Sequence, residues 1–489
     1  MKHKRKSRNG EVDRFSKLPK EILHHILSRL VIRDLARFCC VSSTCKELAL
    51  SAPSVSIGGY NCGFDIDEMP CELRLKLVNA LDRFLISRGD NKLQKFSLSW
   101  QGHCEDEMED PPCFCVNESF RMITWIQNAV RCNVEKLSVN MTFYEPDGEL
   151  LPFPCCVFKC ASLRSLNVEM SFAVLKAPSF SFSSNLETLE LSDVDIADEG
   201  FFKWISCSCK LLKKLILARL NGINIITIES SSLEDFFYIH YEVLNTSYLN
   251  ISGEKIEKIN IDCRYSPRST LLNIIAPKVK YLMLEGNVKN NLNLGDLDCL
   301  QEASIIMEPI VYEFDKASEV LSSLCSVEVL ILNEAIIKAA YREERMHAQL
   351  DKIWCLRINT GSFADDLVPA VVSLLRGTPN LCTLYMCYEP TSLDPKSNTS
   401  GFNKKYWKKQ NLNFISEVEE VTIELSAGSN GIEFARYVLE HAKSLEKMVI
   451  RYLTRESSVK KKLRKSCMIS NAAVIFKKYR ASVDPLSHY

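Results

Sequence analysis

The chain lacks an excess of charge of either sign. Its 489 residues include 61 lysines and arginines and 61 aspartates and glutamates, so the formal net charge at pH 7 is zero. A neutral chain has no overall field to draw in nucleic acid or an anionic membrane. We therefore expect neither as a partner, and any partner must be recognised through a local surface.

Long apolar runs are also missing. No stretch approaches the roughly 18 apolar residues that a membrane-spanning helix requires, since LVPAVVSLL at 367–375 is short and contains Pro369. The first twenty residues are polar and resemble no secretory signal. A soluble intracellular protein is predicted, in the nucleus, the cytoplasm or both. The basic segment Lys2 to Arg8 fits either a nuclear import signal or a solvated tail.

Signatures of catalysis and of metal binding are absent too. The sequence has no phosphate-binding loop, dinucleotide glycine fingerprint, His-Glu-x-x-His or Gly-x-Ser-x-Gly motif, so we expect a non-catalytic protein without cofactor. Its 21 cysteines are odd in number and scattered, which favours reduced thiols packed in the core. The CFC motif at Cys113 and the CSC motif at Cys207 lack the spacing of zinc ligand pairs, so no metal site is predicted.

What the sequence does contain is a repeat. Apolar residues recur in the order apolar, two variable, apolar, one variable, apolar, as in LRSLNV at Leu163 and VEVLIL at Val327. Between Leu163 and Leu381 the copies start roughly 21 to 29 residues apart, the spacing of leucine-rich repeats. Further copies start at Leu93, Val134, Leu186, Leu212, Ile256, Val279 and Ile353, and weaker ones at Leu233 and Leu300. Stacking such units predicts an irregular solenoid of α/β class with a parallel sheet on its concave face.

A different pattern occupies the amino-terminal region. In LPKEILHHILSRL, the residues Ile22, Leu23, Ile26, Leu27 and Leu30 recur at helical spacing, and two shorter helices are predicted to follow, ending near residue 50. About forty residues in three short helices form a marginal core on their own. We therefore expect this module to pack against the solenoid or against a partner.

The same residues resemble the F-box of plant F-box proteins. The matching residues are Asp13, Arg14, Leu18, Pro19, Glu21, Ile22, Ile26, Leu27, Leu30, Asp34, Leu35, Val41, Ser42 and Leu48. The sequence departs from the family at Cys45, where tryptophan is usual. The repeats are similar to the leucine-rich region of these proteins, and Asn413 to Tyr452 resembles their FBD region.

The resemblance implies a domain order and a function. The domains expected are the F-box at 13–52, the leucine-rich-repeat solenoid at 72–390, an FBD-like region at 411–452 and a C-terminal segment at 453–489. The F-box implies binding to the Skp-type adaptor, and through it to the cullin, of an SCF-type cullin–RING ubiquitin ligase, while the repeats select a substrate protein. The residues expected to bind the adaptor are Leu18, Pro19, Ile22, Ile26, Leu27, Leu30, Leu35 and Val41.

Strand alternation gives a prediction for the substrate surface. Residues between the recurring apolar positions should face the concave side of the sheet. In the middle repeats these residues are apolar, and an exposed apolar surface of that size indicates protein binding. The residues are Ile216, Phe237, Ile239, Tyr281, Met283, Ile306, Val329 and Ile331. A register shifted by one residue would instead place them in the core.

Two alternative functions stay open at the level of sequence. A ligand-dependent small-molecule receptor of the same architecture would need a deep pocket ringed by arginine and lysine. An F-box-like scaffold outside a ligase would be favoured if the cysteine at position 45 weakened adaptor binding.

Overall fold

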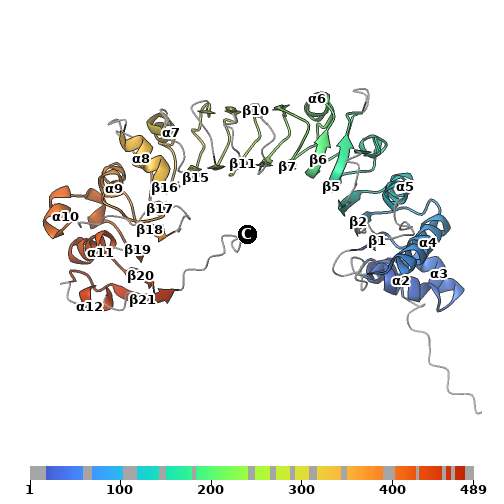
Figure 1. Ribbon diagram of the computed structural model, residues 1–489, viewed down its shortest axis with the longest axis horizontal. Helices are drawn as coiled ribbons and strands as arrows, with labels where there is room; N and C mark the ends of the chain where they lie inside the picture. The colour runs from blue at the N-terminus through green and yellow to red at the C-terminus, as the bar shows by residue number, and fades with distance from the viewer. Residues whose placement is uncertain are drawn as a thin grey trace, which may run out of the picture. The chain divides into compact units, whose positions relative to one another are not determined.

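The computed structural model describes residues 18–58, 69–102, 118–142, 150–178, 183–240, 248–264, 271–286, 292–307, 317–342, 350–388, 402–425, 429–453, 459–463 and 468–479. The chain divides into two compact units, residues 1–223 and 224–489, and each is described by itself (Figure 1). In the described residues, no helix combines the length and apolar character needed to cross a membrane.

The first unit begins with three short helices, α1 (Lys20–Leu27), α2 (Ile32–Cys39) and α3 (Ser43–Leu50). Helix α1 starts directly after Pro19, whose fixed φ suits a helix start. The Ser42 side chain caps α3 by accepting a hydrogen bond from the Cys45 amide at 3.1 Å. Asp34 lies inside the first turn of α2, which begins two residues earlier.

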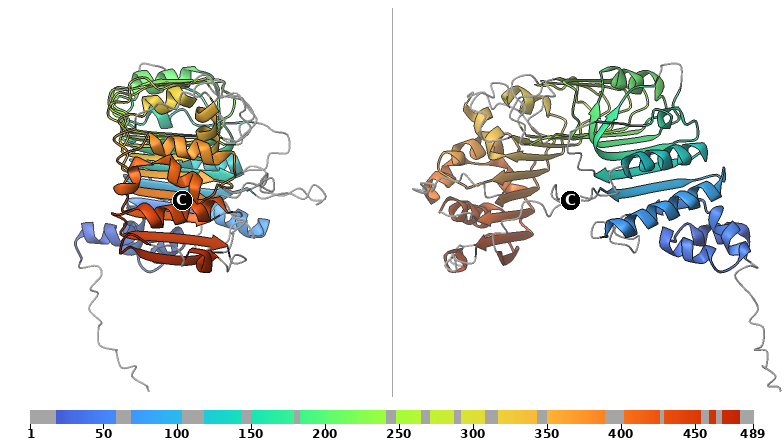
Figure 2. Two further views of the ribbon diagram at one scale, coloured as in Figure 1. Left: turned by 90° about the vertical axis from the view of Figure 1, so that its left-hand side faces the viewer. Right: turned by 45° about the vertical axis from the view of Figure 1, so that its right-hand side comes forward.

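Six parallel strands of the first unit follow one another in chain order, as predicted from the repeats. They are β1 (Ser54–Ile57), β2 (Lys95–Gln101), β3 (Lys136–Thr142), β5 (Ser165–Leu175), β6 (Thr188–Ile196) and β7 (Lys214–Ala218), with the short β4 (Leu151–Pro152) beside the end of β5. The connections include α4 (Cys71–Arg88), α5 (Glu118–Arg131), η1 (Val157–Lys159) and α6 (Gly200–Ser208). Helices α4 and α5 lie on one side of this sheet (Figure 2).

A buried ion pair joins the first two repeats of this unit. The guanidinium of Arg74 on α4 donates to both carboxylate oxygens of Glu118 on α5, at 3.2 and 2.6 Å. Trp100 on β2 donates its indole N–H to the same carboxylate at 2.8 Å. Because both charges are almost fully buried, each depends on the other for compensation.

Arg88 fastens the helical module to the first repeat. This buried residue at the end of α4 donates to the carbonyl oxygen of Leu50 at 2.9 Å and to that of Lys92 at 3.0 Å. Its neighbour Asn91 also donates to the Leu50 carbonyl, at 3.3 Å. Burial lowers the pKa of Arg88 from its ordinary value. The carbonyl end of α3 is thus held by groups from the solenoid, and the helices pack on it as expected.

The second unit contains a longer parallel sheet and a second, four-stranded one. Strands of the main sheet are β9 (Asp235–Ile239), β11 (Lys258–Cys263), β13 (Tyr281–Gly286), β15 (Glu302–Met307), β16 (Val329–Asn333), β17 (Cys355–Thr360), β18 (Thr383–Tyr388), β19 (Glu420–Leu425), β20 (Lys447–Leu453) and β21 (Ala473–Tyr479). The second sheet contains β8 (Ile225–Glu229), β10 (Tyr248–Ser252), β12 (Leu271–Ile275) and β14 (Leu292–Asn293).

Later repeats of this unit return through helices instead of strands. These are α7 (Ala317–Ser323), α8 (Glu334–Arg342), α9 (Leu367–Arg376), α10 (Lys404–Gln410), η2 (Asn413–Ser416), α11 (Asn430–His441) and α12 (Val459–Leu463). Figure 1 shows the change, with β10 among the central repeats and helices from α7 onward. The predicted fold class is confirmed, with helices at the amino terminus followed by a parallel-sheet solenoid.

Recurring apolar positions of the repeats form continuous rows in the core. In the second unit Phe236, Ile259, Leu282, Ala303 and Leu330 lie side by side on adjacent strands, and all are buried. The residues before and after each of them face solvent on the other side of the sheet.

Replacing Arg74 by methionine should destabilise the first unit by about 3–5 kcal/mol, because it leaves the carboxylate of Glu118 buried without its cation. The measurement is urea unfolding followed by Trp fluorescence, in which the variant should reach its unfolding midpoint at a lower urea concentration. Lys76→Met is the control, since it breaks the exposed Lys76–Glu72 pair on the opposite side of the same helix and should change the midpoint little. Equal losses in the two variants would contradict a structural role for the buried pair.

Candidate functional site

The amino-terminal helices expose three large apolar side chains. Ile22 and Ile26, one turn apart on α1, are 48% and 38% exposed, and Val41 after α2 is 72% exposed. Pro19 is also exposed, while Leu18 and Leu30 are half-buried. These six are the predicted adaptor-binding residues that retain accessible surface.

The other two predicted adaptor-binding residues lie in the interior. Leu27 is fully buried, and Leu35 on α2 is almost so. The apolar stripe of α1 is divided, because Leu23 and Leu27 face the helical core while Ile22 and Ile26 face outward. In this structure Leu27 and Leu35 are therefore unavailable for direct contact and support the surface from beneath.

Cys45 occupies a buried position inside α3. A small thiol fills this place in the core among the short helices. The nearby His24 ring lies 3.1 Å from the Ser51 hydroxyl, which links α1 to the end of α3. Burial, and then the charge of Lys20, lower the pKa of His24 from its ordinary value.

Seven of the eight predicted substrate-binding residues lie on the solvent side of the main sheet in the second unit. All seven are half-buried or exposed, so the register anticipated from the sequence agrees with the structure. They are Phe237 and Ile239 on β9, Tyr281 and Met283 on β13, Ile306 on β15, and Val329 and Ile331 on β16. The eighth, Ile216, is half-buried on β7 in the first unit.

Polar side chains separate these apolar ones along each row of the sheet. Asn260 lies in register between Phe237 and Met283, and Ser304 lies between Met283 and Ile331. Sequence reasoning missed these polar residues because it selected apolar ones, although the same alternation rule would have placed them. The surface therefore combines apolar side chains with hydrogen-bonding groups.

Lys258 adds a positive charge beside this surface. Its ammonium lies 5.3 Å from the ring centroid of Phe237, within the range of a cation–π interaction. It is in register with Tyr281 on the next strand. The aromatic rings at this end of the surface are thus next to a cation.

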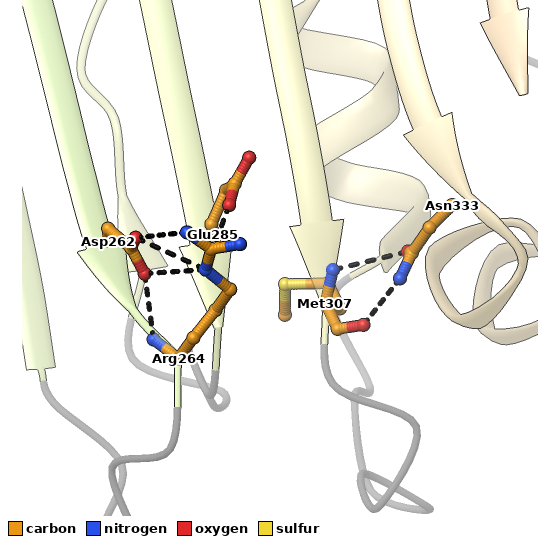
Figure 3. A network of polar contacts seen from close by, with 5 residues as sticks. All are labelled: Asp262, Arg264, Glu285, Met307 and Asn333. Atoms are coloured by element: carbon orange, nitrogen blue, oxygen red, sulfur yellow. Dashed lines mark hydrogen bonds and ion pairs between the residues drawn. The ribbon is translucent and has the colours of Figure 1, made fainter. Parts of the chain in front are cut away.

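A cluster of charges lies at the carboxyl ends of β11 and β13 (Figure 3). Arg264 donates to Asp262 through Nε at 3.1 Å and through Nη2 at 2.7 Å, and its Nε lies 3.2 Å from a carboxylate oxygen of Glu285. Both carboxylates are nearly buried. One guanidinium therefore links two strands at the edge of the apolar surface.

Gly286 ends β13 with a φ of +109°, a conformation that L side chains rarely adopt. A Cβ built on it would lie 2.3 Å from the backbone carbon of Cys263 on β11. Only glycine permits this close approach of the two strands beside the charge cluster.

Asn333 connects the next two strands in a similar position. Its side chain accepts a hydrogen bond from the Met307 amide at 3.2 Å and donates to the Met307 carbonyl (Figure 3). The Asn333 side chain thereby makes the two hydrogen bonds that a backbone residue of a paired strand would make. It extends the pairing of β15 and β16 at the carboxyl end of the two strands.

Comparisons with known proteins agree with this arrangement. Residues 15–55 match the family model of the F-box domain, and residues 122–251 match that of the LRR repeats of FBD-associated F-box protein At5g56370. The chain is 23% identical over 457 residues to the putative F-box/FBD/LRR-repeat protein At5g44950 of Arabidopsis thaliana, covering 90% of this chain and 92% of the relative. It is also 23% identical to the F-box/LRR-repeat protein 13 of Arabidopsis thaliana, covering 94% and 93%.

Among solved structures, the chain matches the crystal structure of a TLR13–ssRNA13 complex with a TM-score of 0.32 and 13% identity. That match covers 73% of this chain and 61% of the other. The family-model matches and the plant relatives confirm the resemblance to F-box proteins with leucine-rich repeats and an FBD region.

The division of helix α1 gives a direct test. Leu27→Ala should destabilise the protein by about 2–5 kcal/mol, because it creates a cavity in the small helical core. Ile22→Ala, one and a half turns earlier on the exposed side, should leave stability nearly unchanged. Urea unfolding followed by far-ultraviolet circular dichroism would compare them, and a larger loss for Ile22→Ala would reverse the assignment of the two faces.

Proposed function

We propose that this chain is the substrate-recognition subunit of an SCF-type cullin–RING ubiquitin ligase. Its amino-terminal helices bind a Skp-type adaptor, and through it a cullin, while the repeats bind a target protein that becomes ubiquitinated. The chain is a non-catalytic adaptor, since the ubiquitin transfer occurs on other subunits. It acts in the nucleus, the cytoplasm or both.

The observation that carries this proposal is the exposed apolar side of a module that matches the F-box model. A three-helix module of this size has few apolar residues to spare, yet Ile22, Ile26 and Val41 face solvent. Exposed apolar side chains gathered on one small module are characteristic of a protein interface. The match of residues 15–55 to the F-box domain supports a Skp-type adaptor as the partner.

The proposed domain order follows the resemblance to plant F-box proteins. It assigns the F-box to 13–52, the repeats to 72–390, the FBD-like region to 411–452 and the C-terminal segment to 453–489. Helices α1 to α3 fall within the first range, and η2, β19, α11 and most of β20 fall within the third. A relative named for an F-box, an FBD region and leucine-rich repeats matches 90% of this chain, which supports this order.

Adaptor binding can be tested by co-purification with a Skp-type adaptor. The double variant Ile22→Asp/Ile26→Asp should lose at least tenfold in retained adaptor, because charges replace the exposed apolar side of α1 and cannot be desolvated without cost. The control is Leu73→Asp/Ile86→Asp, which places the same charges at exposed apolar positions of α4.

Two results would count against the proposal. The first is a folded wild-type chain that fails to retain adaptor. The second is equal retention of adaptor by the two double variants. Circular dichroism spectra of the variants distinguish lost binding from lost folding.

We further propose that the apolar surface of the second unit binds the substrate protein. Its residues are Phe237, Ile239, Tyr281, Met283, Ile306, Val329 and Ile331, and we assign Ile216 of the first unit to substrate contact as well. The mixture of half-exposed apolar and polar side chains on adjacent strands is typical of a protein interface. Aromatic residues such as Phe237 and Tyr281 are frequent anchors of such contacts.

Phe237→Asp/Met283→Asp should abolish substrate capture while the protein stays folded, since neither side chain belongs to the core. Proteins crosslinked to the purified ligase complex and identified by mass spectrometry provide the measurement. Ile225→Asp/Ile275→Asp is the control, because both residues are exposed on the second sheet of the same unit. Unfolding of the Phe237/Met283 variant alone would mean that these side chains are needed for the core, and would overturn the assignment.

A further inference from the structure

Strand β21 is an open edge of the main sheet in the second unit. It pairs in parallel with β20 along its whole length, from Ala473 opposite Lys447 to Tyr479 opposite Leu453. Within the described ranges it pairs with no other strand. An unpaired strand edge presents a row of N–H and C=O groups that can bind another strand.

The rows of apolar core side chains extend as far as β21, where no further strand in the described residues covers them. Val474 and Phe476 lie in register with Met448 and Ile450, which are fully buried. On β21 the corresponding side chains are only half-buried. In inner repeats the following repeat covers these rows, and the described residues provide no such cover at this edge.

Further apolar surface lies next to this edge. Ile475 is 39% exposed, and Met468 and Ile469, a few residues before the strand, are 43% and 55% exposed. Three of the large exposed apolar residues of the protein therefore belong to one short segment. The segment combines a free strand edge with uncovered apolar side chains.

The backbone direction shows which groups are free. The amide of Ala473 donates to the carbonyl of Glu446 at 2.8 Å, on the side of β20. Consecutive residues of a parallel strand direct their N–H and C=O groups to alternate sides. The backbone groups of Val474, Phe476 and Lys478 therefore face away from β20, toward the open edge.

Charges on the last three strands favour a partner of negative sign. Between β19 and β20, Lys447 pairs with Glu420 at 3.0 Å and Arg451 pairs with Glu424 at 2.6 Å. Between β20 and β21, however, Arg451 is in register with Lys477, a residue of the same sign. No acidic partner of Lys477 or Lys478 occurs in the described part of the chain. An acidic residue on an added strand would place an opposite charge beside Lys477.

A third cation lies near the same edge. The ammonium of Lys460 on α12 is 5.7 Å from the ring centroid of Phe476 (Figure 1 labels both elements). The edge is thus apolar along its side chains and basic at its rim.

We propose that β21 binds an extended segment of a partner protein, added as a further strand, in which apolar residues alternate with aspartate or glutamate. The apolar residues would cover Val474 and Phe476 on one face of the sheet, and the acidic ones would lie beside Lys477 on the other face. Lys478 lies on the first face, near the end of the strand. Backbone hydrogen bonds supply affinity in such strand addition, and the alternating side chains supply selectivity. This site is separate from the proposed substrate surface on β9 to β16.

The test uses two blocked, fluorescently labelled seven-residue peptides. One alternates valine with glutamate, and the other alternates valine with lysine. Titration of the full chain, followed by fluorescence anisotropy, should give at least tenfold tighter binding of the glutamate peptide, with weakening as salt is raised. Equal binding of the two peptides, or binding of neither, would overturn the proposal.

Matched variants assign the binding to the edge. Val474→Pro removes an N–H that faces the open side and keeps the hydrogen bonds to β20, so it should lower glutamate-peptide affinity at least tenfold. Val474→Ala keeps that N–H and should have a smaller effect. An equal loss in both would show that backbone pairing is not involved.

Reversing the charge of the lysine side chains tests the proposal independently of backbone hydrogen bonding. Lys477→Glu/Lys478→Glu should invert the preference and favour the lysine peptide. Lys405→Glu/Lys408→Glu, at exposed positions of α10, is the control and should leave the preference unchanged. If the control inverts it as well, the peptides respond to overall charge and the proposal fails.

Two other occupants of the edge are tested in parallel. If peptide binding appears only after deletion of residues 480–489, the edge belongs to the chain's own segment. If sedimentation shows a dimer that Val474→Pro dissociates, the edge pairs with a second copy. Either result would overturn the assignment to a partner protein.

Discussion

A short parallel strand cannot cover its own apolar side, and the architecture of both units depends on this constraint. Each repeat contributes residues such as Leu282 or Leu330 to a row that is buried only because strands lie on both sides of it. Stability is therefore shared between neighbours, as expected for a solenoid. A change in one core position is felt in the adjacent repeats, because the rows are continuous.

The same constraint makes the first and last described strands special cases. At β1 the helical module is tied to the first repeat by Arg88, which binds the carbonyl of Leu50. At β21 no equivalent group lies in the described residues, and Val474 stays half-buried. The contrast explains why the amino-terminal helices can leave Ile22 and Ile26 exposed, since their own core already rests on the solenoid.

Much of the architecture was predictable because it depends on local periodicity. The apolar spacing located the strands, even at the weaker copies, where Leu233 and Leu300 are buried just before β9 and β15. It also placed Phe237 and Met283 on the solvent side. The division of α1 was not predictable, because a stripe of five apolar residues does not show which of them the other two helices cover. The link from Arg264 to Asp262 and Glu285 also depends on strands that meet only in the fold.

Alternation along each strand places the side chains of the core on one side of the sheet and the solvent-facing side chains on the other. On β13, Leu282 and Leu284 are buried, whereas Tyr281 and Met283 between and before them face solvent. Substitutions at the second pair should change the chemistry of the surface at little cost in folding free energy, since the core rows remain intact. The charge cluster at Asp262 and the bridge made by Asn333 fix the ends of these strands. The sheet therefore holds its solvent-facing side chains at fixed positions, because those positions are set by a core that these side chains do not form.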